Sequence, residues 1–344
     1  MPTSEPKHRD DNLMERFDRA GARQFRARDA VIAVAIMAAI LIAAAGTSIR
    51  KAGNEMNPGI GRDAVLAVGR PAAWIADQLP LRPAAHTLTA FLSPDTSLNG
   101  PGAFVSVAVG ANAAIAPVTP DAFDPSQLGL PPPPKRQLHR LLVTGDSMSQ
   151  PLDQDLAQAL APNGVQVTRD PHIGTGISST LLVDWGKLSV YQVKRYHPDA
   201  VVVFIGANDG YSMPGPGGTS VNCCSAAWAA IYAGRVRQMM NTYRQAGVAR
   251  VYWLTLPAPR EAARVKIARV VNAAIEVGAE PWRDQIRVID TVPVFTPGDR
   301  YRDSMTINRQ PTIVRQSDGI HLNDAGSALA SKIVLATIDN DFTR

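Results

Sequence analysis

The sequence predicts an α/β domain of three layers, with helices covering both faces of a mostly parallel β-sheet. Two observations support this fold class. From residue 138 onward, short apolar runs typical of buried strands alternate with segments of helical periodicity. Several of these runs end at a glycine followed by polar residues, as strands do where they reach the functional edge of such a sheet.

Each expected element rests on the apolar periodicity of its own segment. Strands are expected at residues 139–144, 165–168, 200–205, 250–256 and 285–290, and helices at 151–160, 226–246, 260–278 and 324–338. The run Ala200–Ile205 (AVVVFI) is the strongest strand pattern. Parallel strands that are buried on both faces have such unbroken apolar runs.

The composition is that of a globular protein with an additional apolar segment. Of the 344 residues, 45% are hydrophobic and 19% are charged, and the formal net charge is +5. No block of Lys and Arg interleaved with aromatic residues is present, so a nucleic-acid partner is not expected. The two cysteines are adjacent, and no Cys/His spacing typical of zinc occurs, so we expect neither a metal nor a cofactor.

An uncharged segment at residues 30–49 predicts a single transmembrane helix. Its length suits a bilayer at about 1.5 Å of rise per residue. Arginines are concentrated before this segment, and only Arg50 and Lys51 follow it closely, so we expect a cytoplasmic N-terminus and an external main domain. A cleaved signal peptide, with a small-residue site at 43–46, is the alternative. The long polar lead of residues 1–29 favours the uncleaved anchor.

Between the anchor and the main domain, the sequence has the character of a stalk. Within residues 61–92 it predicts two short amphipathic helices, broken by Pro80 and Pro83. From 93 to 137 Pro, Gly, Ala and Ser accumulate, which predicts an extended, semi-rigid spacer. The expected organisation is a cytoplasmic tail (1–29), an anchor (30–49), juxtamembrane helices with a Pro-rich linker (50–137) and one main domain (138–344).

Four polar blocks lie at the expected functional edge of the sheet. They are Gly145-Asp146-Ser147, Gly174-Thr-Gly176, Gly206-Ala-Asn208-Asp209 and Asp318-Gly-Ile-His321. A serine between a strand and a helix is well placed to be a nucleophile, because the nearby N–H groups favour developing negative charge. A hydroxyl nucleophile also needs a base, an orienting carboxylate and an oxyanion site, and the other blocks offer candidates for each.

These blocks, in this order, resemble the SGNH/GDSL hydrolase superfamily over residues 139–338, and more narrowly a membrane-anchored bacterial branch of it. The resemblance implies a flavodoxin-like sheet and a hydrolase domain at 138–344. It departs from the usual Gly-Asp-Ser-Leu at Met148, which replaces one apolar residue by another.

The resemblance also implies a role for each matching residue. Ser147 would be the nucleophile, His321 the general base and Asp318 the residue that orients His321. The oxyanion would be bound by the N–H groups of Ser147 and Gly176 and by the side-chain amide of Asn208. Gly174 is the alternative to Gly176 as the glycine of the second block.

Several neighbouring residues have two readings. Asp146, Tyr211 and Trp185 are candidates for substrate contact, but a helix-capping role for Asp146 and simple packing for the aromatic residues, Trp228 included, are the alternatives. Asp209 is expected to bond loop backbone, and His172 to be a solvated loop residue. The glycine-rich segment 210–225 is expected to form a wall or lid near the site. Cys223 and Cys224 within it could be free thiols, an intermolecular bridge or a strained ring.

The function expected from this combination is a serine esterase that removes O-acyl groups, with acetyl favoured, from cell-envelope carbohydrate. Its place would be the bacterial inner membrane, with the catalytic domain outside the cytoplasm. An O-acyltransferase with the same triad is the first alternative, and it would need a separate multi-helix partner to supply acyl groups. A non-catalytic envelope-binding module is the second alternative, and a lipid esterase also stays open.

Overall fold

The computed structural model describes residues 60–78, 101–104 and 117–344, and isolated positions 28, 31, 32, 50 and 53. Two compact units, 1–84 and 85–344, are distinguished. The predicted transmembrane segment 30–49 lies outside the described residues except for positions 31 and 32. None of the described helices is long and apolar enough to span a bilayer. The membrane anchor therefore stays a prediction.

In the first unit, one amphipathic helix is described. Helix α3 (Ile60–Gln78) buries Leu66, Ala72 and Ala73, whose spacing places them on one face. It corresponds to the first of the two helices expected within 61–92, and it continues through Pro71. The second expected helix, after Pro83, lies outside the described residues.

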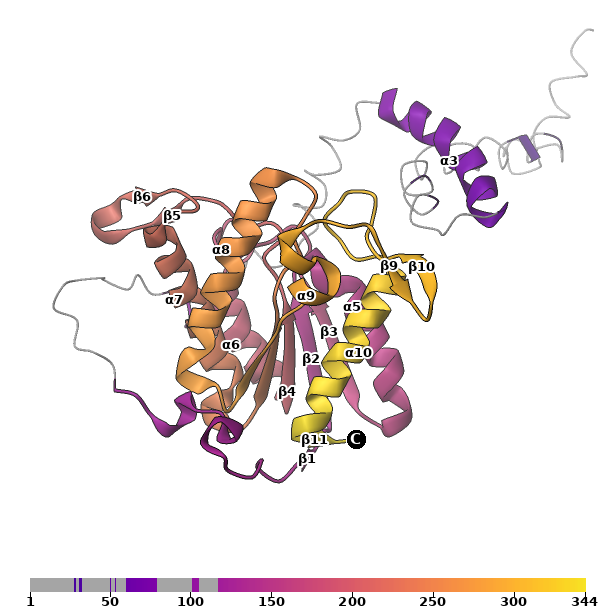
Figure 1. Cartoon of the computed structure of the whole chain (residues 1–344). Coiled ribbons are helices and arrows are strands. Elements are labelled where there is room, and N and C mark those ends of the chain that lie inside the picture. The colour runs from indigo at the N-terminus through magenta and orange to yellow at the C-terminus, as the bar shows by residue number, and fades with distance from the viewer. Residues whose placement is uncertain are drawn as a thin grey trace, which may run out of the picture. The chain divides into compact units, whose positions relative to one another are not determined.

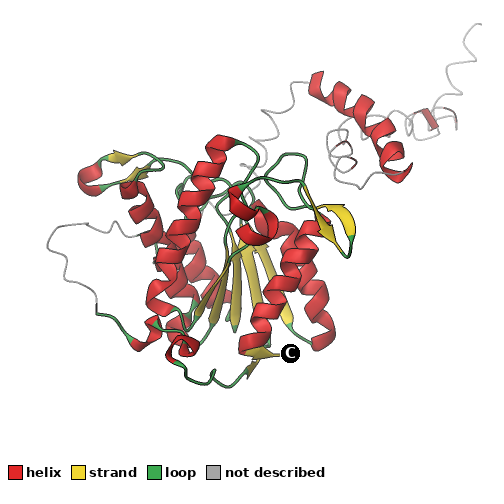
Figure 2. Cartoon of the chain, in the orientation of Figure 1, coloured by secondary structure: helices red, strands yellow, loops and turns green. Residues whose placement is uncertain are grey.

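The second unit is built on the parallel sheet that the sequence predicts, shown in Figures 1 and 2. In spatial order its five strands are β3 (Gln166–Pro171), β2 (Arg140–Gly145), β4 (Ala200–Phe204), β7 (Arg250–Leu254) and β8 (Ile286–Ile289). All neighbouring strands are parallel. The order is that of flavodoxin-like sheets, in which the strand order reverses between the first and third strands, here β2 and β4. The α/β fold class is confirmed.

Helices cover both faces of this sheet (Figure 1). One face carries α5 (Gln150–Leu160) and α10 (Asp324–Asp341), which pack against each other. The other face carries α6 (Trp185–Tyr196), α7 (Ala226–Tyr243) and α8 (Ala262–Ala279), packed side by side. The strand residues between these layers, Leu142, Val143 and Val201–Phe204, are fully buried. This burial on both faces explains their unbroken apolar runs.

The nucleophile turn follows β2 at a point where only glycine fits. Gly145 has φ +146°, and a Cβ atom there would lie 2.0 Å from the carbonyl oxygen of Phe204 on β4. Glycine therefore lets the two central strands stay paired while the chain turns out of the sheet. Ser147 begins the short 3₁₀ turn Ser147–Ser149, which leads directly into α5.

Helix α6 is absent from the sequence prediction, because polar residues occupy its buried face. Gln192 is fully buried and donates to Thr144 Oγ1 at 2.8 Å and to Asp170 Oδ2 at 2.9 Å. It also accepts a hydrogen bond from Tyr243 at 2.6 Å. The apolar periodicity that identifies a helix is interrupted by this network.

Smaller elements complete the unit. They are the antiparallel pair β9 (Ser304–Ile307) and β10 (Gln310–Ile313), the antiparallel pair β5 (Met213–Pro214) and β6 (Ser220–Val221), the parallel pair β1 (Arg136–Gln137) and β11 (Phe342–Thr343), and the short helix α9 (Val292–Phe295). These short elements have too few residues to show a hydrophobic period.

The described part of the Pro-rich segment contacts the main domain, rather than being extended throughout as the sequence predicts. Asp124 caps a 3₁₀ turn at Pro125–Leu128 and forms an ion pair with Arg287. The carbonyl of Gly102 accepts a hydrogen bond from the α7 residue Gln238 at 3.2 Å. A backbone carbonyl of this segment is therefore hydrogen bonded to the domain and not to water. Where the domain begins as an independent folding unit stays a prediction.

Candidate active site

Three side chains from two distant parts of the sequence form one hydrogen-bonded chain. Ser147 Oγ lies 2.7 Å from His321 Nε2, and His321 Nδ1 lies 2.6 Å from Asp318 Oδ2. With Nδ1 protonated and donating to Asp318, Nε2 is the acceptor for the Ser147 hydroxyl. A serine, an imidazole and a carboxylate in this order can activate a hydroxyl for attack on a carbonyl carbon. The structure thus brings together the three residues that we predict to be catalytic.

The turn that carries the acid and the base is held by its own backbone. Asp318 Oδ1 accepts hydrogen bonds from the N–H groups of Ile320 at 2.8 Å and His321 at 3.1 Å. Partial burial acts to raise the pKa of Asp318, but the hydrogen bonds from the His321 ring and from these N–H groups, with the attraction of the imidazole, hold this pKa well below its usual range. Asp318 is therefore an anion that fixes both the position and the tautomer of His321.

A buried arginine, Arg315, donates hydrogen bonds to this turn. Arg315 is 1% exposed, and it donates to the carbonyl of Ile320 at 2.8 Å and to that of Ala258 at 3.3 Å. Burial lowers the pKa of Arg315 to about 10, although Tyr301 and Asp318 oppose the shift. The sequence analysis did not identify Arg315, because no motif distinguishes it among the 35 Lys and Arg residues.

The candidate oxyanion donors meet at the same edge of the sheet. Asn208 Nδ2 donates to the carbonyl of Thr175 at 3.1 Å, immediately before Gly176, and lies 3.4 Å from Asp146 Oδ2. The side chain of Asn208 therefore links the second and third sequence blocks. The choice of Gly176 over Gly174 stays a prediction: a Cβ atom at 176 would lie 2.7 Å from Asp209 Oδ1, whereas Gly174 has φ +77°.

Asp209 organises the loop that presents Gly176. Its Oδ1 accepts the N–H of Ser178 at 2.6 Å, and its Oδ2 accepts the hydroxyl of Tyr232 at 2.7 Å. Burial raises the pKa of Asp209, against the effect of these hydrogen bonds. The predicted structural role of Asp209 is confirmed.

Asp146 is a buried connector and has no surface for a substrate. Its Oδ1 accepts the N–H of Met148 at 2.9 Å, and its Oδ2 accepts the N–H groups of Gly206 and Ala207, both at 2.9 Å. Burial raises its pKa to about 6, although these three donors act in the opposite direction. We therefore correct the predicted substrate contact, since the side chain is 0% exposed and acts as the cap of the nucleophile turn.

The aromatic candidates for substrate contact differ in how far their side chains are exposed. Trp185 is fully buried and donates to Thr175 Oγ1 at 3.2 Å, so its predicted contact with substrate is corrected to a packing role. Trp228 is also buried, stacked on Tyr232 with ring centroids 4.9 Å apart. Tyr211 is 59% exposed and stays a candidate for substrate contact.

His172 is not the solvated loop residue that we expected. Its ring packs edge-on against Trp185, with centroids 5.5 Å apart. Its Nε2 also lies 3.2 Å from Asp170 Oδ1. His172 therefore has a structural role, packed close to the second sequence block.

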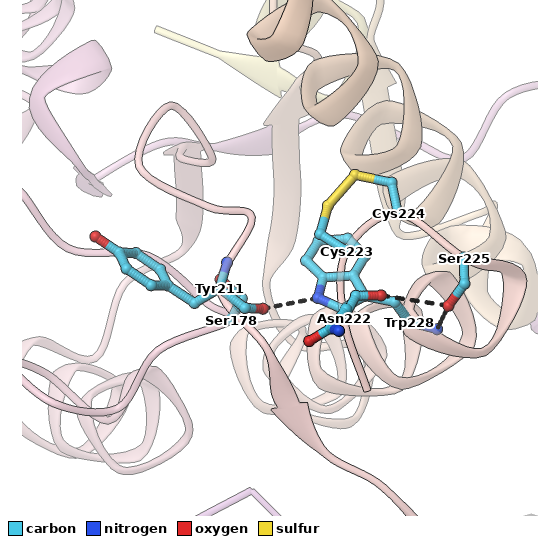
Figure 3. The surroundings of a disulfide bond; sticks show 7 residues. All are labelled: Ser178, Tyr211, Asn222, Cys223, Cys224, Ser225 and Trp228. Carbon is cyan, nitrogen blue, oxygen red and sulfur yellow. Dashed lines mark hydrogen bonds between the residues drawn. A yellow bond between two sulfur atoms is a disulfide. The ribbon is translucent and has the colours of Figure 1, made fainter. Parts of the chain in front are cut away.

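The glycine-rich loop after Asn208 contains a disulfide between neighbouring residues, Cys223 and Cys224. The sequence left three states open for these cysteines, and the structure has the intrachain ring. Figure 3 shows this disulfide beside the start of α7, with the ring of Tyr211 pointing away from it. Trp228 Nε1 donates to the carbonyl of Tyr211 at 2.8 Å, which ties the start of the loop to α7.

An apolar pocket adjoins the triad. Its empty volume, including the open mouth, is about 340 Å³. It is lined by Met148, Gly206, Ala207, Leu256, Pro257, Pro259, Arg264, Ile267, Ala268 and Ile320. Across the described ranges, no three His, Cys, Asp or Glu side chains gather in a way that could hold a metal ion.

Several solved structures are similar to this chain, whereas no curated protein matches it. One is Est24, a carbohydrate acetylesterase from Sinorhizobium meliloti, with 13% identity and a TM-score of 0.36, covering 58% of this chain and 99% of that one. The C-terminal catalytic domain of the Streptococcus pneumoniae peptidoglycan O-acetyltransferase A has 13% identity, a TM-score of 0.35 and coverages of 60% and 95%. An aryl esterase from M. smegmatis has 13% identity, a TM-score of 0.38 and coverages of 59% and 100%.

A family model matches residues 140–337, which is more than half of the chain and contains all four sequence blocks. The resemblance to the SGNH/GDSL hydrolase superfamily rests on the four sequence blocks and stays a prediction. The chain belongs to the family described as DUF459, protein of unknown function.

Proposed function

We propose that this chain is a serine esterase that removes O-acyl groups from cell-envelope carbohydrate through an acyl-enzyme. The observation that carries the proposal is the hydrogen-bonded chain from Ser147 Oγ through His321, 2.7 Å away, to Asp318. The esterase and acetyltransferase activities of the similar solved structures belong to those proteins, and here they only suggest which substrates to test first.

In the first half of the reaction, Ser147 Oγ attacks the ester carbonyl carbon while His321 Nε2 takes the hydroxyl proton. The negative charge on the carbonyl oxygen is met by the N–H groups of Ser147 and Gly176 and by the amide of Asn208. The bond to the sugar oxygen then breaks, and the imidazolium returns the proton to the leaving hydroxyl. Ser147 is left carrying the acyl group.

In the second half, water replaces the sugar. His321 takes a proton from the water as its oxygen adds to the acyl carbon, and the bond to Ser147 Oγ then breaks. Oγ regains the proton from His321, and a carboxylic acid is released. Asp318 stays ionised throughout and stabilises the imidazolium that forms in each half.

The first test is hydrolysis of p-nitrophenyl acetate by the full chain in mild detergent. Ser147→Ala is expected to lower kcat/KM at least about 10³-fold. Ser149→Ala is the matched control, because this serine lies in the same 3₁₀ turn and donates to the carbonyl of Asp146 rather than contacting His321. Equal activity in wild type and Ser147→Ala would contradict the assignment of the nucleophile.

The same acyl-enzyme supports transfer to a sugar hydroxyl instead of water, so an O-acyltransferase is the alternative. Adding a glycan acceptor and following its mass decides between the two, since only a transferase adds the acyl group to the glycan. Glycan binding that Ser147→Ala leaves unchanged, with no turnover of any ester, would instead indicate a binding module.

We also propose that residues 30–49 anchor the enzyme in the inner membrane with the catalytic domain outside the cytoplasm. The arginine-rich lead before the segment supports this orientation. The Cys223–Cys224 disulfide is in agreement with it, because disulfides persist in oxidising compartments. Cleavage of the domain by protease added to spheroplasts, but not by protease confined to the cytoplasmic side, is the expected result.

A further inference from the structure

The apolar pocket is lined by the sequence neighbours of two triad residues. Two of its lining residues are Met148, which follows Ser147, and Ile320, which precedes His321. Leu256, Pro257, Ile267 and Ala268 also line the pocket. A substituent on the carbonyl carbon of an ester held at Ser147 can therefore enter the pocket.

The backbone polar groups at the pocket wall are already hydrogen bonded. The N–H groups of Gly206 and Ala207 donate to Asp146, both at 2.9 Å. The carbonyl of Ala207 accepts from Arg264 Nη1 at 3.1 Å. A sugar hydroxyl that entered the pocket would lose its hydrogen bonds to water without finding a replacement, which is unfavourable. The pocket therefore suits the apolar part of a sugar ester, which is its acyl chain.

Arg264 is the charged residue of the lining, and its charge is balanced locally. Its Nε lies 3.5 Å from Glu261, and its side chain is 41% exposed. The guanidinium thus lies between the Ala207 carbonyl, a neighbouring carboxylate and solvent. This arrangement favours an uncharged acyl chain over one that ends in a carboxylate.

We infer that the pocket binds the acyl group, and that this group is an uncharged chain longer than acetyl, such as butanoyl. The inference rests on the proposed function, because the chain is the one attached to Ser147 in the acyl-enzyme. It changes the expected substrate, since the sequence favours acetyl. A methyl group contacts fewer of the apolar lining residues than a longer chain does.

The test compares p-nitrophenyl acetate and p-nitrophenyl butyrate with the full chain, each rate divided by that of the uncatalysed reaction. The wild type is expected to prefer butyrate by roughly 10-fold or more in kcat/KM, since each methylene bound in an apolar pocket has an effect of this size. Ala268→Phe fills the pocket and should remove this preference, with a larger loss of kcat/KM for butyrate than for acetate. Ala268→Val fills it less, and should reduce the preference in part.

Val277→Phe is the matched control, because it adds the same ring to the same helix at a position 44% exposed and outside the pocket lining. It should hydrolyse both esters like wild type. Thermal unfolding of each variant identifies any loss of fold, and where Ala268→Phe is unfolded the comparison rests on Ala268→Val.

Each contrary outcome has its own meaning. A wild type that prefers acetate, or a folded pocket variant that keeps the preference for butyrate, overturns the inference and leaves the esterase intact. Faster hydrolysis of the p-nitrophenyl hemisuccinate ester than of butyrate overturns the inference that the acyl chain is uncharged. It would indicate that Arg264 binds a carboxylate at the end of the chain. Hydrolysis that persists in Ser147→Ala overturns the proposed function instead.

The pocket can also be tested without turnover. Ethyl and butyl p-nitrophenyl phosphonates form a stable adduct on a nucleophilic serine, which mass spectrometry detects. Faster labelling of Ser147 by the butyl compound, lost in Ala268→Phe, supports the inference. Equal labelling by the two compounds overturns it.

Discussion

Asp146 accepts a hydrogen bond from the N–H of Gly206 at 2.9 Å, and this contact joins two sequence blocks that lie 60 residues apart. The same carboxylate oxygen accepts the N–H of Ala207 at 2.9 Å. Ser147 follows Asp146, and Asn208 follows Ala207. The distance between the nucleophile and one oxyanion donor is therefore set by a buried side chain that does not face the substrate.

We predict that Asp146→Asn destabilises the fold and lowers activity. An amide in this place turns one acceptor oxygen into an N–H donor that faces backbone N–H groups. Leaving such a buried donor unpaired costs about 1–3 kcal/mol. Urea unfolding should show this loss, and kcat should fall as the spacing of Ser147 and Asn208 relaxes.

The control for this variant is Asp155→Asn on α5. Asp155 accepts the hydroxyl of Ser327 at 2.6 Å, and Ser327 belongs to helix α10 and not to a site block, so the same isosteric change should cost less and leave kcat unchanged. Equal losses in the two variants would show that Asp146 has no special role in placing Ser147.

A second prediction concerns the pH dependence of stability. The pKa of Asp146 is raised from 3.8 to about 6 by burial. Between these values the folded state binds more protons than the unfolded state, so this group stabilises the fold fully below about pH 4 and loses that contribution as the pH rises through 6. The change is on the order of 3 kcal/mol.

The measurement is the free energy of unfolding at pH 4.5 and pH 7 for wild type and Asp146→Asn. The wild type should lose more stability between these values than the variant does. Asp209 is buried with a raised pKa as well, so the variant should retain part of the slope. Identical slopes in the two proteins would rule out titration of Asp146 in this range.

Positions that depend on local sequence could be predicted. Ser147, Asn208 and His321 each follow a strand or precede a helix, and the carboxyl ends of parallel strands meet at one edge. Sequence order therefore brings them together. The sheet itself follows from apolar runs such as Val201–Phe204, which are unbroken because both faces are covered.

Features that depend on distant polar contacts could not be predicted. Gln192 completes a buried network with Thr144 and Tyr243, and its polarity hides helix α6 from a search for apolar periodicity. The burial of Trp185 likewise follows from the path of the chain around it, which composition does not reveal. The pocket is lined by residues from four separate segments (148, 206–207, 256–268 and 320), so no local sequence pattern predicts it.

We predict that Asn208→Ala lowers kcat by about 10²–10³, the usual effect of losing one oxyanion donor. The variant also loses the hydrogen bond to the carbonyl of Thr175, so a modest loss of stability should accompany it. Kinetics with p-nitrophenyl esters separate the two effects, because the transition-state contribution appears in kcat and not in KM. Asn222→Ala, on the exposed loop, is the control, and a similar fall in its kcat would contradict the assignment.

Arg315 is expected to act as a positioning residue for the acid–base turn. Its guanidinium, 1% exposed, donates to the carbonyl of Ile320 at 2.8 Å, next to His321. Arg315→Met keeps much of the side-chain volume but leaves buried carbonyls unpaired, which should cost about 1–3 kcal/mol and lower kcat. Arg315→Lys should restore part of the activity, since an ammonium can donate to one of these carbonyls.

A loss of stability alone would not show that Arg315 positions His321, because other arginines also donate to backbone carbonyls. Arg302→Met is therefore the comparison, because Arg302 Nε donates to the carbonyl of Phe295 at 3.0 Å, on a different loop. Both variants should lower the melting temperature, but only Arg315→Met should lower kcat, because only Arg315 donates to the carbonyl next to His321. If the two variants differ in stability alone, Arg315 holds the fold and not the base.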